Sequence, residues 1–144
     1  MEYKLSHLDI MDKTILYLLY YDIFYYFMHR LLHTKMFYLI HKIHHKKQIP
    51  DYFDFYNVDI VEIPITSVGL GVALYLHEIY VYQLLCSILI INVRGVMAHE
   101  TNCVFLLGDH HLDHHKYIYC NYGEYWLDYI FDTARGRQAR INQE

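Results

Sequence analysis

Residues 22–45 read DIFYYFMHRLLHTKMFYLIHKIHH, and this segment carries two histidine motifs. An apolar, aromatic run leads directly into His29 and His33, which are four residues apart. The second motif, HxxHH, places His41, His44 and His45 at positions i, i+3 and i+4. Residues at these spacings lie on one face of an α-helix, so we expect their imidazoles to converge on a metal ion. The segment therefore predicts a helix that leaves an apolar environment carrying metal ligands.

The same HxxHH motif returns at residues 111–115, and the chain holds 12 His in 144 residues. Even at this His content, two copies of one spacing are an improbable accident. So many clustered imidazoles cannot all be core residues, because burying polar rings without partners costs too much free energy. Eight or nine ligands exceed the needs of one ion, which indicates two. Imidazole binds Fe, Zn, Cu and Ni, and the spacing alone does not select one of them.

Cysteine usage argues against a structural zinc site. Such sites usually take four ligands and include Cys, but Cys86, Cys103 and Cys120 all lie outside the histidine motifs. Their odd number and the lack of CxxC spacing are typical of thiols in a reducing compartment. The net charge of −4 argues against a nucleic-acid partner, because binding nucleic acid requires clustered Lys and Arg. The N-terminal residues include acidic side chains and no long apolar core, unlike a cleavable signal peptide.

Three apolar runs, at residues 14–28, 60–76 and 79–93, predict a membrane-associated helical bundle. Alternation of apolar and polar residues, which marks strands, is absent, so the predicted fold class is all-α. A full membrane span typically needs about 20 residues, and each run is shorter than this. The last two runs form an apolar hairpin hinged at residues 77–78. A buried hairpin in a soluble protein is the alternative. Lys and Arg flank the histidine motifs and avoid the hinge, which predicts a cytosolic histidine-rich cap.

In order and spacing, these motifs resemble those of the fatty acid hydroxylase/sterol desaturase superfamily of integral membrane di-iron enzymes. Residues 22–33 are similar to the family motif D-x-x-Y-Y-x-x-H-R-x-x-H, and residues 37–45 to L-Y-x-x-H-K-x-H-H. His99 lies where the family has an isolated His. Residues 111–123 (HLDHHKYIYCNYG) resemble H-x-x-H-H-x5-N-Y-G, and residues 128–133 (DYIFDT) resemble the closing W-D-x-x-F-G-T. The resemblance runs from about Asp22 to Thr133.

The chain also departs from the family pattern. Residues 59–62 (DIVE) keep the Glu of the family's His-Pro-x-Glu stretch without its His and Pro. Leu127 and Asp132 replace the Trp and the Gly of the closing motif. The length predicts a single domain, residues 1–144, whereas family members usually carry one or two further membrane helices upstream. We therefore expect a minimal version of the family domain or a fragment of one.

The resemblance implies nine metal ligands: His29, His33, His41, His44, His45, His99, His111, His114 and His115. Three histidines are left out, because His110 points about 100° away from His111 on a helix, His77 lies at the apolar hinge, and His7 lies outside every motif. Ligand imidazoles usually donate their second N–H to a carboxylate or carbonyl. The candidates for such support are Asp22, Glu62, Asp113, Asn121 and Asp128. Asp22 is the most strongly indicated, because a carboxylate in an apolar run is costly unless it is paired.

The activity implied by the resemblance is O2-dependent attack on a C–H bond of a fatty acyl or sterol substrate, by hydroxylation or desaturation. The implied cofactors are two iron ions, with zinc possible in the isolated protein. The chain has no GxGxxG or CxxCH motif, so electrons must come from an external donor. The resemblance implies cytochrome b5 or a similar redox carrier. It also implies a membrane location, in the endoplasmic reticulum, with the histidine clusters facing the cytosol.

Two other hypotheses remain open at this point. One is a catalytically inactive or truncated metal-binding membrane protein, indicated by the departures from the family pattern. The other is a zinc-loaded scaffold in which the metal serves only stability. Within the lipid class, the sequence does not select among fatty acyl chains, sphingolipids and sterols.

Overall fold

The computed structural model of the chain describes residues 7–136. Within these residues every regular element is a helix, which confirms the all-α prediction. In chain order the elements are α1 (His7–Leu32), α2 (Tyr38–His41), the 3-10 helices η1 (His44–Lys46) and η2 (Tyr52–Tyr56), α3 (Glu62–Thr66), α4 (Val68–Leu76), α5 (Val81–Ala98), the 3-10 helix η3 (Thr101–Cys103), α6 (Val104–Leu107), α7 (His110–Tyr117) and α8 (Tyr125–Ile130).

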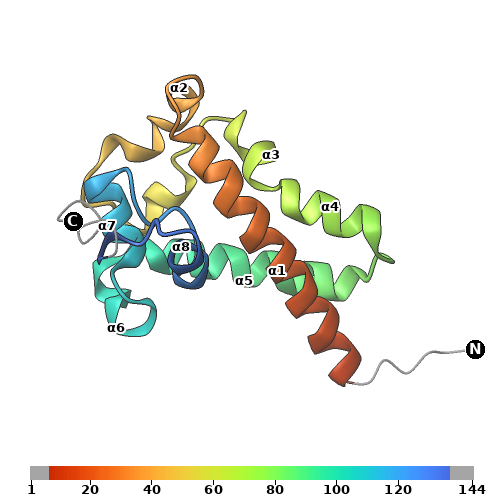
Figure 1. Cartoon of the computed structure of the whole chain (residues 1–144). Coiled ribbons are helices and arrows are strands. Elements are labelled where there is room, and N and C mark those ends of the chain that lie inside the picture. The colour runs from red at the N-terminus through yellow and green to blue at the C-terminus, as the bar shows by residue number, and fades with distance from the viewer. Residues whose placement is uncertain (1–6, 137–144) are drawn as a thin grey trace, which may run out of the picture.

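α1 is the longest element and packs against an apolar hairpin. Its 26 residues contain neither Gly nor Pro, so nothing in the sequence interrupts its hydrogen-bond ladder. Figure 1 shows α5 crossing α1 and α4 lying at the side of α1, with α4 and α5 joined to each other at the end remote from α7. The first arm of this hairpin is divided at Ser67 into α3 and α4, and the second arm extends to Ala98. The hinge lies between Leu76 and Val81, at the predicted position.

Two features hold the hairpin against α1. Gly69 allows a close approach of α4, because a Cβ at this position would lie 2.4 Å from the main-chain oxygen of Tyr20. At the hinge, the Tyr17 hydroxyl donates a hydrogen bond to the main-chain oxygen of Glu78 at 3.0 Å. The His77 ring nitrogen lies 3.2 Å from the Tyr20 hydroxyl, so His77 takes part in helix packing.

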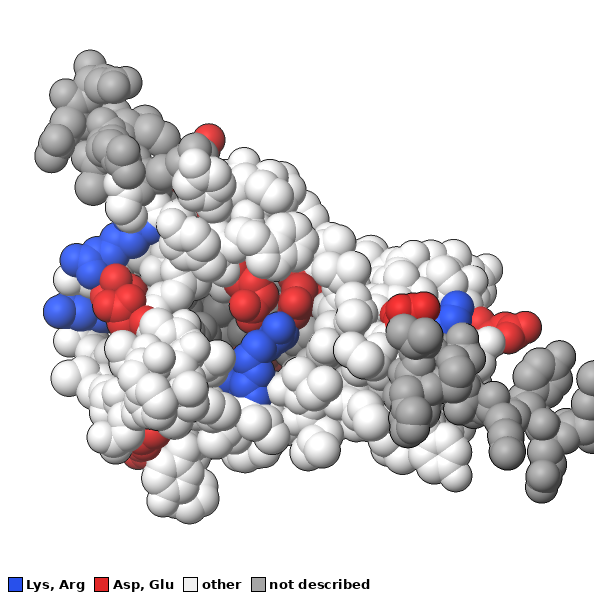
Figure 2. Space-filling model, turned by 90° about the horizontal axis from the view of Figure 1, so that it is seen from below, with Lys and Arg blue, Asp and Glu red and all other residues white. Residues whose placement is uncertain are grey.

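The outer surface of the helices is strongly apolar. α5 is the only helix in the described residues that is long and apolar enough to cross a membrane, and only 17% of it is buried against the rest of the protein. α1 exposes an apolar side chain at every fourth position, namely Met11, Ile15, Leu19, Ile23, Phe27 and Leu31. The face seen in Figure 2 is mostly uncharged, with the charged side chains gathered in a few clusters. Surface of this kind requires lipid or a partner, and it agrees with the predicted membrane-associated bundle.

Short helices, among them α2, α6, α7 and α8, gather around one end of α1 and α5 and form a cap (Figure 1). Tyr26 of α1 is fully buried there, where it packs with Tyr122 and Leu127. Its hydroxyl lies 3.0 Å from that of Thr133. Asp128, also fully buried, accepts a hydrogen bond from the main-chain N–H of Tyr122 at 2.8 Å. These contacts fix the loop between α7 and α8 against the end of α1, where the first histidines lie.

Candidate metal centre

Nine histidines of the cap form two adjacent groups. The five-His group consists of His29, His33, His41, His45 and His114, and the four-His group of His44, His99, His111 and His115. Within each group the candidate ligand nitrogens all lie within 4.8 Å of one another. The groups adjoin, since the ring centroids of His45 and His115 are 4.6 Å apart. The structure thus brings together all nine expected ligands, and their binding of metal stays a prediction.

The third histidine motif serves both groups, which differs from the expectation that its histidines share one face. On α7, His111 and His115 are four residues apart and enter the four-His group. His114 lies about 100° around the helix from His115, and it enters the five-His group. A single turn of helix therefore supplies ligands to both sides.

The second motif is divided in the same way, although it does not form one continuous α-helix. α2 ends at His41, and His45 has a non-helical backbone conformation within η1. His41 and His45 enter the five-His group, whereas His44 enters the four-His group. The unbroken helix α7 shows the same division of its motif, so the break between α2 and η1 is not the cause.

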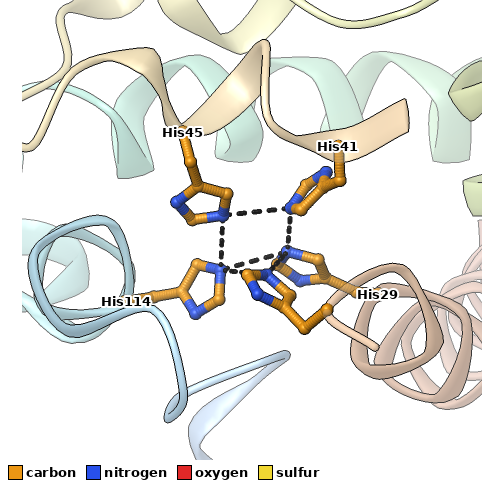
Figure 3. Close-up of side chains that lie close together, drawn as sticks. His29, His41, His45 and His114 are labelled. Carbon is orange, nitrogen blue, oxygen red and sulfur yellow. Dashed lines mark hydrogen bonds between the residues drawn. The ribbon is translucent and has the colours of Figure 1, made fainter. Parts of the chain in front are cut away.

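The imidazoles of the five-His group direct their Nε2 atoms toward a common centre (Figure 3). The His114 Nε2 atom lies 3.1 Å from the Nε2 atoms of His29, His33 and His45. The His41 Nε2 atom lies 2.9 Å from that of His29 and 3.0 Å from that of His45. Two nitrogens bound at right angles, each about 2.1 Å from a metal ion, are about 3 Å apart. The spacing of these nitrogens therefore fits ligands of one ion.

Main-chain carbonyls fix the tautomers of two of these histidines. The Nδ1–H of His29 donates to the oxygen of Tyr122 at 2.5 Å, and the Nδ1–H of His114 donates to that of Cys120 at 2.6 Å. A neutral imidazole carries one N–H, so both Nε2 atoms hold lone pairs, and they face each other at 3.1 Å. Two lone pairs at this distance repel each other unless a cation lies between them. The donor set therefore fits a bound metal ion.

His99 lies at the centre of the four-His group, directly after the last residue of α5. Its Nδ1–H donates to the main-chain oxygen of Gly95 at 2.7 Å, which leaves a lone pair on Nε2. This Nε2 atom lies 3.2 Å from that of His44, 3.1 Å from that of His111 and 3.2 Å from that of His115. An all-imidazole set of this kind suits iron, zinc, copper or nickel.

Burial keeps these imidazoles neutral. Burial and, to a smaller extent, neighbouring imidazoles together lower the pKa of His45 to about 2 and that of His115 to about 3. The pKa values of His44, His111 and His114 are also well below the usual value, with burial as the largest cause. Neutral imidazole is the form that binds metal. At neutral pH the two groups therefore present lone pairs without having to lose protons first.

Glu62 lies where a support residue was expected. Its Oε1 atom accepts a hydrogen bond from the Nδ1–H of His41 at 2.8 Å, and the carboxylate is almost fully buried. This contact leaves the Nε2 lone pair of His41 facing the five-His group. Burial raises the pKa of Glu62 to about 8. A cation held by the histidines would act in the opposite direction and favour the carboxylate.

Three other support candidates form their bonds elsewhere in the cap. Asp128 accepts a hydrogen bond from the main-chain N–H of Tyr122, and the main-chain oxygen of Tyr122 orients His29. The Asn121 side-chain oxygen accepts from the main-chain N–H of Arg135 at 2.9 Å. Asp113 forms an ion pair with the Arg135 guanidinium at 2.7 Å. Asp128 and Asn121 therefore position the ligands indirectly, by holding the loop between α7 and α8. The ion pair of Asp113 with Arg135 links α7 to the chain that follows α8.

Asp22 pairs with Arg94 of α5 and not with a ligand imidazole. Arg94 also lies 3.3 Å from Glu124, so this charged cluster joins α1, α5 and the loop before α8. Arg94 was not among the expected residues, although it directly follows the apolar run at residues 79–93, where an arginine indicates a carboxylate partner. His110, which was left out of the ligand set, lies 3.1 Å from Asp128.

An apolar cavity of about 330 Å³ adjoins the histidines. Its apolar walls include Phe55, Ile63, Leu70, Ile88 and Ile91. His44, His99 and Glu62 also line it. The volume lies within the range of small-molecule pockets, and the apolar lining suits a hydrocarbon ligand.

The fold and the site together define a class of protein, namely an all-α, membrane-associated protein with two histidine groups able to hold metal ions. The chain belongs to the fatty acid hydroxylase family, whose model matches residues 14–133. This match confirms the resemblance drawn from the histidine motifs.

Curated relatives agree with this assignment. The chain is 32% identical to a Delta(7)-sterol 5(6)-desaturase of Gibberella zeae, over 98% of this chain and 46% of that protein. It is 25% identical to the lathosterol oxidase of Homo sapiens, over 94% of this chain and 48% of that protein. It is 29% identical to a Delta(7)-sterol 5(6)-desaturase of Aspergillus fumigatus, over 90% of this chain and 50% of that protein. The chain therefore spans about half the length of these relatives. No solved structure matches the chain.

Proposed function

We propose that the chain is an O2-dependent lipid desaturase or hydroxylase with two iron ions, acting on a C–H bond of a sterol or fatty acyl substrate. The observation that carries the proposal is the convergence of nine neutral imidazoles in two adjacent groups beside an apolar cavity. The relatives named above are sterol desaturases and a lathosterol oxidase. Their names favour a sterol as the substrate within this class.

Two irons held by the five-His and four-His groups would supply the O2 chemistry that breaks an unactivated C–H bond. Desaturation combines two substrate hydrogens, O2, two electrons and two protons, and it yields one C=C bond and two molecules of water. In this reaction the main-chain oxygens of Tyr122 and Cys120 hold their imidazoles in the ligand tautomer, and Glu62 does so for His41. The walls of the apolar cavity hold the hydrocarbon and exclude water from the reacting carbon.

Two electrons per turnover must reach the site from a separate donor. We propose cytochrome b5 or a similar small redox carrier, at the endoplasmic reticulum membrane, with the cap facing the cytosol. Exposed Arg30, Lys42 and Lys46 each directly follow a histidine of the five-His group. Basic residues near membrane segments favour the cytosolic side, and they complement an acidic carrier.

A metal-binding protein without turnover is the second candidate, because Asp59 and Asp132 stand where the family pattern has His and Gly. The replacement in the closing motif is weak support for this candidate, because the backbone there accommodates it. Asp132 replaces the Gly of the family pattern, and it keeps a left-handed backbone conformation with φ of 54°. Asp is one of the residues that adopt this conformation with least strain, so the local structure tolerates the replacement.

The test begins with the full chain purified from membranes. We expect two irons per chain, consumption of O2 when reductant and a Δ7-sterol are added, and a desaturated or hydroxylated product by mass spectrometry. The control is the His44→Ala, His45→Ala double variant, which removes one ligand from each group and should abolish product. Two irons without O2 uptake would favour the second candidate, and absence of metal would contradict both. Release of the chain from membranes by high salt alone would contradict the membrane location.

A further inference from the structure

We propose that the two ion positions are not equivalent: the four-His group holds the ion that substrate and O2 reach, and the five-His group holds an ion enclosed by protein. The inference rests on the proposed function, because it requires both groups to bind iron. It assigns to each histidine either a position facing the reacting carbon or a position behind it.

Three cavities beside the site, formed by the described residues, touch one group only. The cavity of about 330 Å³ is lined by His44 and His99. A second cavity, of about 80 Å³, is lined by His99 and His111, and a third, of about 90 Å³, by His111. None of these three cavities is lined by a residue of the five-His group. A molecule that enters through any of them therefore meets the four-His group first.

The number of ligands points the same way. An octahedral ion with five imidazoles keeps one free position, whereas an ion with four keeps two. In structural metal sites the protein ligands fill the coordination positions, whereas catalytic metal sites keep one position open. The Tyr122 ring also packs over the five-His group, with its centroid 5.2 Å from that of His33 and 5.7 Å from that of His114. Tyr122 is itself buried, so it separates these imidazoles from solvent.

The five-His group is also more firmly anchored. His29, His41 and His114 each donate Nδ1–H to a carbonyl or carboxylate. In the four-His group, one ligand of four, His99, has such a bond, against three ligands of five in the other group. The remaining ligands with a buried Nδ1 atom and no hydrogen-bond partner are His33 and His45 of the five-His group, and His44 and His115 of the four-His group. Hydrogen bonds of this kind restrict the orientation of ligand imidazoles. Looser ligands suit an ion whose coordination changes during a reaction.

Phe55 lies on the side of the four-His group that faces the cavities. Its ring lines both cavities that touch His99, and its centroid lies 5.7 Å from that of His99. The ring packs on Gly95, where a Cβ would lie 2.1 Å from it. We therefore expect the substrate chain to lie against Phe55.

Nitric oxide, a small probe that binds ferrous iron at an open position, tests this assignment. The full chain is loaded anaerobically with iron, its iron content is measured, and bound nitric oxide is counted by infrared spectroscopy. We expect one nitrosyl per two irons. The matched variants are His44→Ala and His45→Ala, which are neighbours in sequence but belong to different groups. We expect His44→Ala to lose the nitrosyl, and His45→Ala to keep it at the wild-type N–O stretching frequency.

Two nitrosyls in the wild type, none, or the reverse pattern in the variants would overturn the assignment. If either substitution removes both irons, the wild type decides, because pulsed EPR counts the imidazole nitrogens on the iron that carries the nitrosyl. Four nitrogens support the assignment and five refute it. Wild-type protein with fewer than two irons contradicts the proposed function itself, so the two failures are distinguishable.

Discussion

His29 and His114 are separated by 85 residues in sequence, yet their Nε2 atoms lie 3.1 Å apart. Each holds its only N–H on Nδ1, where a main-chain oxygen accepts it. The two lone pairs therefore face each other across the five-His group. This arrangement is unfavourable in the metal-free protein and becomes favourable when a cation binds, so metal binding and folding of the cap are linked.

Metal should therefore stabilise the protein. At a free metal concentration about one hundred times the Kd, a single site adds about 2.7 kcal/mol to the free energy of unfolding. Thermal unfolding in detergent, with iron(II) or zinc(II) and after chelation, measures the difference in Tm. Magnesium serves as the control, because imidazole is a poor ligand for it. Equal Tm values with and without iron or zinc would contradict the link.

Glu62 should control metal affinity through His41. Removing such a carboxylate partner typically weakens metal binding by about 10- to 100-fold, so Glu62→Leu should lose affinity to this extent. Glu62→Gln should lose less, because its amide oxygen can still accept the Nδ1–H of His41. The control is Glu78→Leu, because Glu78 lies at the hinge, where its carboxylate accepts a hydrogen bond from the Tyr80 hydroxyl. Competition with a calibrated chelator gives the Kd values, and unchanged affinity in Glu62→Leu would refute the role.

Acid should destabilise the metal-free protein. The pKa values of His45 and His115 are about 2 and about 3 in the folded protein, against an ordinary value of 6.5. Between these values the unfolded chain binds more protons than the folded chain, so the free energy of unfolding falls as the pH falls below 6.5. Each histidine contributes up to about 1.4 kcal/mol per pH unit in this window. Denaturant unfolding from about pH 8 to pH 5 measures the slope, and a flat profile would contradict the burial of neutral imidazoles.

Two glycines of α4 give a matched test of the helix packing. Gly69→Ala places a Cβ 2.4 Å from the Tyr20 main-chain oxygen, and overpacking of this kind costs about 1–3 kcal/mol. A Cβ at Gly71 would have no neighbour within 4 Å, so Gly71→Ala should raise helix stability by up to about 1 kcal/mol. Thermal unfolding of both variants should therefore show Tm changes of opposite sign. A neutral Gly69→Ala would show that α4 does not approach α1 this closely.

The sequence predicted the fold class, the hairpin hinge and the histidines that meet, because these depend on residue types and spacing. Helical periodicity placed His111 and His115 together. It did not predict that the adjacent His44 and His45 enter different groups, since that depends on where the other ligands lie around the motif in the folded cap. The carbonyls of Tyr122 and Cys120 left no signal either, because every residue has one, and only the folded loop selects which of them face an imidazole.

The pairing of Asp22 with Arg94 shows a different limit. The cost of a carboxylate in an apolar run indicated that Asp22 needs a partner. Asp22 was expected to support a ligand imidazole, but the crossing of α1 and α5 presents Arg94 instead. Partner choice across helices depends on their packing, which periodicity does not encode.

One peptide bond joins His44 to His45, and these neighbours belong to different groups. Because of this connection, a shift of the backbone at this bond displaces one ligand of each group. α7 adds a second tie of the same kind through His114 and His115. We therefore expect a residue inserted between His44 and His45 to damage both positions, whereas a single side-chain substitution removes a ligand from one of them.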